Sequence, residues 1–112
     1  MIEIEEIEHR WNESKRLISL LVLLEYEYPA VLDKVANTKI NNETIQELIF
    51  YALEFDSRHW AEKAVIWIEA DFPINNRICD KLLLISEQKS DSQNLRHRSL
   101  KQAKRWQHAN AT

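Results

Sequence analysis

The sequence predicts an all-α protein, built as a stack of five or six helices in antiparallel hairpins or, failing that, as an irregular helical bundle. Apolar residues recur with helical spacing in every segment long enough to judge. The chain has no glycine, the residue that hairpin turns and phosphate-binding loops use for positive φ angles. A helix–turn–helix pattern also occurs twice, and the 112 residues fit one domain, 1–112.

The N-terminal third predicts a long helix followed by a short one. The long helix is expected over residues 3–27, with a break near Asn12 or Ser14. Its stretch 17–24 is apolar nearly all round, which is typical of a central, buried helix. Pro29 suits the first position of a helix, where the N–H that proline lacks would have no partner. A short helix is therefore expected to begin at Pro29.

Four further helices are expected between short polar turns. Asn41 or Asn42 is expected to cap the third helix, because an asparagine side chain accepts a hydrogen bond from the free N–H groups of the first turn. Asp56 and Ser57 should end this helix and cap the fourth, which Pro73 stops. The last two helices are expected over 76–88 and 93–107. The residues expected to face the core are Ile45, Leu48, Ile49, Ala52, Leu53, Trp60, Ala61, Ala64, Trp67, Ile68, Ile78, Cys79, Leu82, Leu83 and Ile85.

The repeated pattern divides the chain into three units. Ile40-Asn41-Asn42 recurs as Ile74-Asn75-Asn76, an offset of 34 residues. A helical hairpin of this length cannot bury its own apolar face and must stack on a neighbour. We therefore expect helical hairpins over 40–73 and 74–108, with 1–39 as a divergent first unit or cap.

Charge is distributed unevenly along the chain. Residues 41–80 hold eight acidic and three basic side chains, whereas residues 81–112 hold two acidic and seven basic ones. An acidic middle region would attract a basic protein and speed its capture. The acidic residues of this region are Glu43, Glu47, Glu54, Asp56, Glu62, Glu69, Asp71 and Asp80. The partner-binding residues predicted among them are Glu54, Asp56, Glu62, Glu69 and Asp71.

Two other interpretations of the charge pattern remain open. In the first, the basic last helix packs near the acidic first helix and both are solvated. In the second, an anion such as a nucleic-acid phosphate binds the last helix. The residues predicted for that role are Arg96, Arg98, Lys101 and Arg105. A sequence pI of about 5.8 argues against nucleic acid.

The motifs of catalysis and metal binding are missing from the sequence. Glu6 and His9 form a single Glu-x-x-His element, whereas a di-iron bundle uses two, with two further glutamates. Cys79 lies on an apolar stripe, as a small buried hydrophobe would. We expect no catalytic residue, no metal and no cofactor. Trp106 either attaches the last helix to the domain or anchors a partner.

Targeting signals are also missing. A single cysteine fits a reducing compartment, and no basic start with an apolar run and a cleavage site is present. The longest apolar run is far shorter than the ~20 residues of a membrane-spanning helix. We expect a cytoplasmic protein without membrane contact, as a monomer or homodimer.

The C-terminal half resembles small bacterial helical-repeat proteins of the HEAT-like type. The residues that carry this resemblance are Trp60, Trp67, Phe72-Pro73-Ile74, Leu95-Arg96-His97-Arg98 and Trp106. Some proteins of that type resemble immunity proteins, which neutralise toxins of rival cells, so the resemblance implies binding and not chemistry. The sequence therefore predicts an acidic protein-binding module, most concretely an immunity-type inhibitor of a basic toxin. The alternative is a regulatory or nucleic-acid-associated adaptor that uses the basic C-terminal helix.

Overall fold

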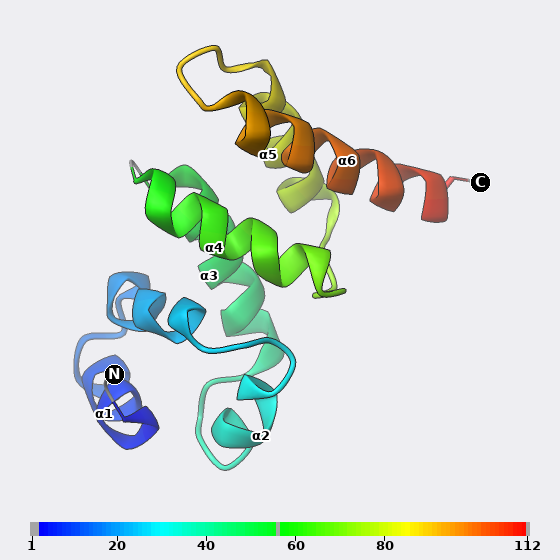
Figure 1. The fold of residues 1–112 in the computed structure, drawn as a ribbon. Helices are drawn as coiled ribbons and strands as arrows, with labels where there is room; N and C mark the ends of the chain where they lie inside the picture. Colours follow the sequence, from blue (N-terminus) through cyan, green and yellow to red (C-terminus); the bar gives the residue numbers. More distant parts are fainter. Residues whose placement is uncertain (1–2, 56, 112) are drawn as a thin grey trace.

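The described residues, 3–55 and 57–111 of a computed structural model, form helices joined by short turns, with no strand among them (Figure 1). This confirms the all-α class. The elements in chain order are α1 (Ile4–Ser14), the 3₁₀-helix η1 (Leu17–Glu25), α2 (Val31–Val35), α3 (Asn42–Glu54), α4 (Arg58–Glu69), α5 (Asn76–Glu87) and α6 (Gln93–Ala109).

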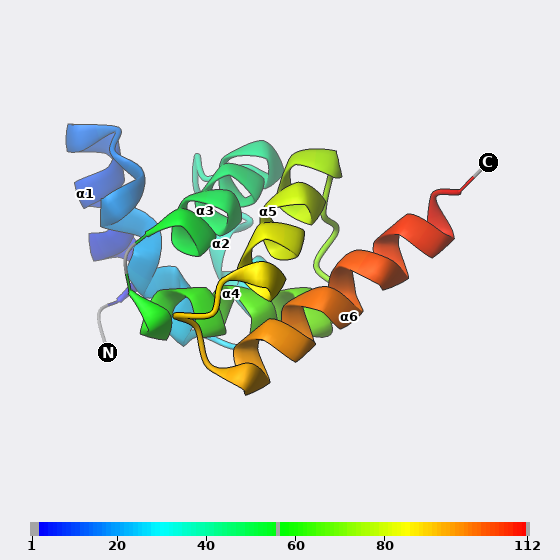
Figure 2. The ribbon, with the colours of Figure 1, turned by 90° about the horizontal axis from the view of Figure 1, so that it is seen from above.

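Two consecutive helix–turn–helix pairs make up most of the molecule. The pair α3–α4 is followed by the pair α5–α6, with α3 packed on α5 and α4 packed on α6. Viewed from above, α3 and α5 therefore form one layer and α4 and α6 the other (Figure 2). On the side away from α5 and α6, η1 packs on α3 and α4, and α1 packs on η1.

Asparagine caps begin the first helix of each pair. The side chain of Asn41 accepts a hydrogen bond from Thr44 N at 2.8 Å, and that of Asn75 accepts one from Ile78 N at 2.9 Å. The predicted cap at Asn41 is confirmed. Ser57 stands at the N-cap position of α4, as predicted, although its side chain makes no capping hydrogen bond. Asp56 lies outside the described residues.

The N-terminal third differs from the single long helix expected there. The break follows Ser14, where Lys15 adopts a left-handed conformation with φ of 55°. Beyond it the apolar stretch is a 3₁₀-helix instead of an α-helix, although it is buried as predicted. The prediction for Pro29 is wrong, because α2 begins at Val31; the Tyr28–Pro29 peptide bond is cis.

The core lies between the two layers and continues beneath η1. Of the fifteen residues predicted to face it, all but Trp60 and Leu83 are buried, and these two pack against it while partly exposed. Trp67 is 2% exposed, and its indole N–H donates to the carbonyl of Tyr26 at 3.1 Å. This bond attaches the segment after η1 to α4. Trp106 is also partly buried against the core, so it attaches the last helix to the domain.

The last helix lies far from the first. α6 packs on α5 and α4, whereas α1 lies at the opposite end of the molecule (Figures 1 and 2). The interpretation that the basic last helix packs near the acidic first helix is therefore wrong. The acidic residues beside α6 belong to α4 and to the turn that follows it.

Candidate functional site

The predicted acidic patch is divided between different parts of the fold. Glu62 and Glu69 lie on α4, and Asp71 follows that helix. Glu54 lies at the end of α3, in the other layer, where it lines a polar cavity with Arg58 and Lys81. The predicted patch thus does not form one continuous acidic surface over the described residues.

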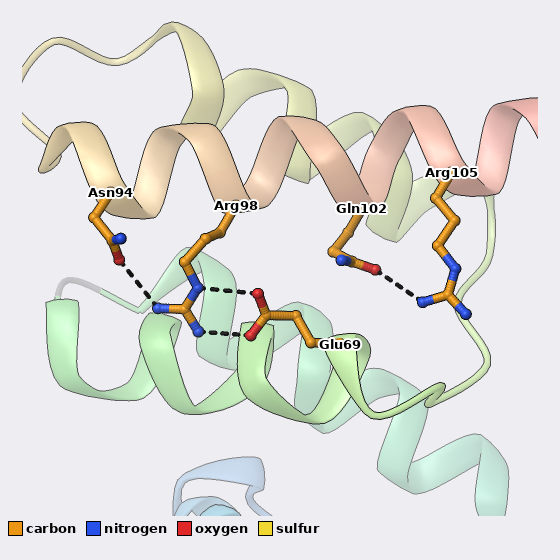
Figure 3. A network of polar contacts seen from close by, with 5 residues as sticks. All are labelled: Glu69, Asn94, Arg98, Gln102 and Arg105. Carbon is orange, nitrogen blue, oxygen red and sulfur yellow. Dashed lines mark hydrogen bonds and ion pairs between the residues drawn. The ribbon is translucent and has the colours of Figure 1, made fainter.

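Glu69 is bound to the last helix by a bidentate ion pair (Figure 3). Arg98 Nε donates to one carboxylate oxygen of Glu69 at 3.0 Å and its terminal nitrogen donates to the other at 2.7 Å. The second terminal nitrogen of Arg98 donates to the side-chain oxygen of Asn94 at 3.2 Å. The hydrogen bonds to Glu69 raise the pKa of the Arg98 guanidinium, with a smaller contribution from the charge of Glu62. Because both side chains are about two-thirds buried, this pair is a structural contact between α4 and α6.

Asp71 makes the second charged contact to α6, through an ion pair with Arg105. Its backbone has φ of 76°, in the left-handed region that usually takes glycine. The N–H of Asp71 bonds to the carbonyl of Ile68 and that of Phe72 bonds to the carbonyl of Trp67, the pattern of a Schellman motif. The Phe72 and Trp67 rings complete the motif with an apolar contact. In a chain without glycine, Asp71 therefore ends α4.

The cations of α6 are divided between two sides of the helix. Arg98 and Arg105 face α4, and Arg96 donates to the carbonyl of Ser86 at 3.1 Å. Of the predicted anion-binding residues, only Lys101 has no bonded partner among the described residues. It belongs to an exposed basic stripe at helical spacing, which consists of His97, Lys101, Lys104 and His108.

The exposed side of α3 carries three carboxylates that have no bonded partner among the described residues. Glu43, Glu47 and Glu54, at positions i, i+4 and i+11, project from one side of the helix and form the α3 acidic face. None of the three makes an ion pair or hydrogen bond with a residue that the structure describes. Phe50 lies between them, and the guanidinium carbon of Arg77 is 3.8 Å from its ring centroid. Sequence reasoning included Glu43 and Glu47 in the acidic region but did not select them as binding residues.

The residues that the sequence suggested for metal binding or nucleophilic chemistry are paired or buried. Glu6 pairs with Arg10, and His9 pairs with Glu13. Cys79 is 1% exposed, and burial raises the pKa of its thiol, with a smaller contribution from Asp80. In the described part of the chain, no three His, Cys, Asp or Glu side chains are grouped to hold a metal ion.

Comparisons with protein-family models, with curated proteins and with solved structures find no match to this chain. Among the described helices, none is both long and apolar enough to cross a membrane.

Proposed function

We propose that this chain is a small protein-binding module and that the α3 acidic face is its contact surface. One observation carries the proposal: three exposed carboxylates lie on one side of α3 and have no bonded partner among the described residues. A charge already held by an ion pair must lose that pair before it can bind a partner. The charges on α3 incur no such cost.

The partner that suits this surface is a basic protein. Negative potential speeds the encounter with a positively charged partner, and charge complementarity selects against acidic ones. Phe50, half-buried between the carboxylates with the Arg77 guanidinium over its ring, adds an aromatic side chain of the kind common at the centre of interfaces. An immunity-type inhibitor of a basic toxin is the most concrete form of this function, with the α3 acidic face covering the toxin's active surface.

The test is affinity capture from a lysate of the source cell, with charge reversal on α3. The binding variant is Glu43→Lys/Glu47→Lys. The matched control, Glu5→Lys/Asp33→Lys, makes the same change in net charge at exposed carboxylates on α1 and α2. We expect a basic protein to be retained by the native chain and by the control, and to be lost from the α3 variant.

Equal loss from both variants would mean that net charge alone retains the partner, and would contradict the proposal. Retention by both would exclude α3 as the contact surface. Once the partner is purified, its activity with and without the chain separates an inhibitor from an adaptor.

The exposed basic stripe on α6 favours a second candidate function, an adaptor that binds an acidic partner. Lys101 and Lys104 are exposed, and α6 contains no acidic residue of its own. This function predicts that a Lys101→Glu/Lys104→Glu variant loses its partner while the α3 variant keeps it.

A further inference from the structure

The α3 acidic face and the exposed basic stripe of α6 carry complementary groups at matching positions of their helices. The carboxylates of α3 stand at positions i, i+4 and i+11, at Glu43, Glu47 and Glu54. The lysines and histidines of α6 stand at positions i, i+4, i+7 and i+11, at His97, Lys101, Lys104 and His108. Each set therefore forms one line along its helix, about 16 Å long.

The side chains of both lines are free to make a contact between molecules. All of them are exposed, and none forms an ion pair or side-chain hydrogen bond with a residue that the structure describes. By contrast, Arg98 and Arg105, on another side of α6, are paired with Glu69 and Asp71 of the same chain. A partner of the exposed basic stripe has no such pair to replace.

The two lines cannot meet within one molecule. The helix α3 belongs to one layer and α6 to the other (Figure 2). Each line lies on the side of its helix opposite the buried residues, so the two lines point away from the core in different directions. A second copy of the chain, however, brings its own basic stripe, with the charge and the spacing that complement the α3 acidic face.

We propose that this chain associates with itself head to tail, with the exposed basic stripe of one copy lying along the α3 acidic face of the next. The matching spacing places Glu47 opposite a lysine, and Glu43 and Glu54 opposite histidines, whether the two helices run parallel or antiparallel. An imidazole can donate a hydrogen bond to a carboxylate in either protonation state. The second lysine of the stripe lies opposite Phe50.

Arg77 opposes this contact at its centre, which provides a distinctive test. Its guanidinium carbon is 3.8 Å from the ring centroid of Phe50, and it lines the same groove as Glu43 and Glu47 without pairing with either. The charge of Arg77 therefore repels the lysine that lies opposite Phe50. Removing that charge should tighten the association, whereas damage to the surface would weaken it.

The contact joins two different surfaces, so each bound copy keeps one surface free for a further copy. Such a contact produces an open chain of molecules unless its rotation closes a ring. This inference rests on the proposed function, because it takes the α3 acidic face as a contact surface and names a second copy as a partner of it. A basic protein that binds α3 would then compete with the neighbouring copy and dissociate the assembly.

Sedimentation velocity of the purified chain tests the association. It is measured over a series of protein concentrations at about 0.01 M and about 1 M salt, where the Debye length is about 30 Å and about 3 Å. We expect the average sedimentation coefficient to rise with protein concentration in low salt and to stay at the monomer value in high salt. Absence of a rise in low salt would overturn the inference.

Two neutralised variants identify the surfaces. Glu43→Gln/Glu47→Gln removes the α3 side of the contact. Lys101→Gln/Lys104→Gln removes the α6 side. Each variant alone should stay monomeric because it keeps only one surface, whereas an equimolar mixture should form a dimer that grows no further. Association of either variant alone as strong as that of the native chain, or a mixture that stays monomeric, would overturn the inference.

Two further variants separate the contact from net charge. The matched control, Glu5→Gln/Asp33→Asn, neutralises exposed carboxylates on α1 and α2 and should associate as the native chain does. Arg77→Gln should lower the dissociation constant at least threefold. Weakening of the control equal to that of the α3 variant, or an Arg77→Gln variant that associates no more tightly than the native chain, would overturn the contact. Circular dichroism shows whether each variant keeps its helices.

Capture from the lysate separates failure of this inference from failure of the proposed function. Lys101→Gln/Lys104→Gln leaves α3 intact, so this variant should still retain the basic protein while it no longer associates with itself. If the native chain stays monomeric but retains a basic protein through α3, only the self-association is wrong. If the native chain associates with itself through α3 but retains no basic protein, the self-association stands and the proposed basic partner is wrong.

Discussion

Carboxylates on α3 and carboxylates beside α6 contribute alike to the acidic middle region of the sequence, yet their surroundings differ. Glu43 and Glu47 are exposed and have no bonded partner among the described residues. Glu69 and Asp71 are each held by an arginine of α6. The number of charges in a region therefore does not give the number that are available to a partner. The second pair of carboxylates attaches one helix of the fold to another.

Charge reversal at Arg98 should have the largest effect on stability. Arg98→Glu removes the bidentate contact between α4 and α6 and places a third carboxylate beside Glu69 and Glu62. We expect the free energy of unfolding to fall by about 2 kcal/mol, from the lost pair and the new repulsion together. Urea unfolding followed by tryptophan fluorescence measures this change.

The matched reversal on α3, Glu47→Lys, should change the free energy of unfolding by less than about 0.5 kcal/mol, because it breaks no contact. The swapped double variant Glu69→Arg/Arg98→Glu should recover about 1 kcal/mol by restoring opposite charges. If Arg98→Glu and Glu47→Lys were equally destabilising, the distinction between the two sets of carboxylates would fail.

Sequence patterns predicted the helices better than the contacts between them. Asn41 and Asn75 act locally, on the N–H groups of the next turn, so their caps can be recognised without the tertiary structure. Glu69 and Arg98 are 29 residues apart, and their pairing depends on how α4 and α6 are rotated in the fold. No local sequence pattern predicts how α4 and α6 are rotated relative to each other. For this reason Glu69 was predicted to be available for a partner.

The N-terminal third shows a second limit of structure prediction from sequence patterns. Residues 17–24 are so uniformly apolar that their burial is predictable. The same uniformity leaves no periodic spacing of apolar and polar residues, which is the signal that would identify the type of helix. The helix start expected at Pro29 follows a positional preference of proline, and the structure begins α2 two residues later, at Val31.

A substitution at Asp71 separates its backbone role from its charge. Asp71→Val places a β-branched side chain at a φ of 76°, which should cost about 1–2 kcal/mol of folding stability. Asp71→Asn removes the charge but keeps a side chain that tolerates the left-handed region, and should change stability by less than about 0.5 kcal/mol. Thermal and urea unfolding of the two variants compares them. Equal losses for the two variants would mean that the ion pair with Arg105, which both remove, is the main role of Asp71.

Glu25 provides the smallest and most specific test, because it is a paired carboxylate outside α4 and α6. One oxygen lies 2.5 Å from His59 Nε2 and the other 3.5 Å from Lys63 Nζ, so the pair joins η1 to α4. The pKa of Glu25 is lowered below 4.5, and the main cause is the hydrogen bond with His59. Burial opposes this effect, and the charge of Lys63 lowers the pKa further. A lowered folded pKa gives stability that is present above pH 4.5 and is lost as the pH falls through the folded value.

The Glu25→Gln variant should therefore be less stable than the native chain by about 0.5 kcal/mol at neutral pH, since the pair is partly exposed and screened by solvent. This difference should shrink toward zero in strong acid, where both chains are uncharged at this position. Urea unfolding at a series of pH values measures it, and Glu47→Gln is the matched control for a carboxylate without a partner. If the stability difference persisted unchanged in acid, the amide of the variant would be disturbing the packing. The charge of Glu25 would then not be the source of its contribution to stability.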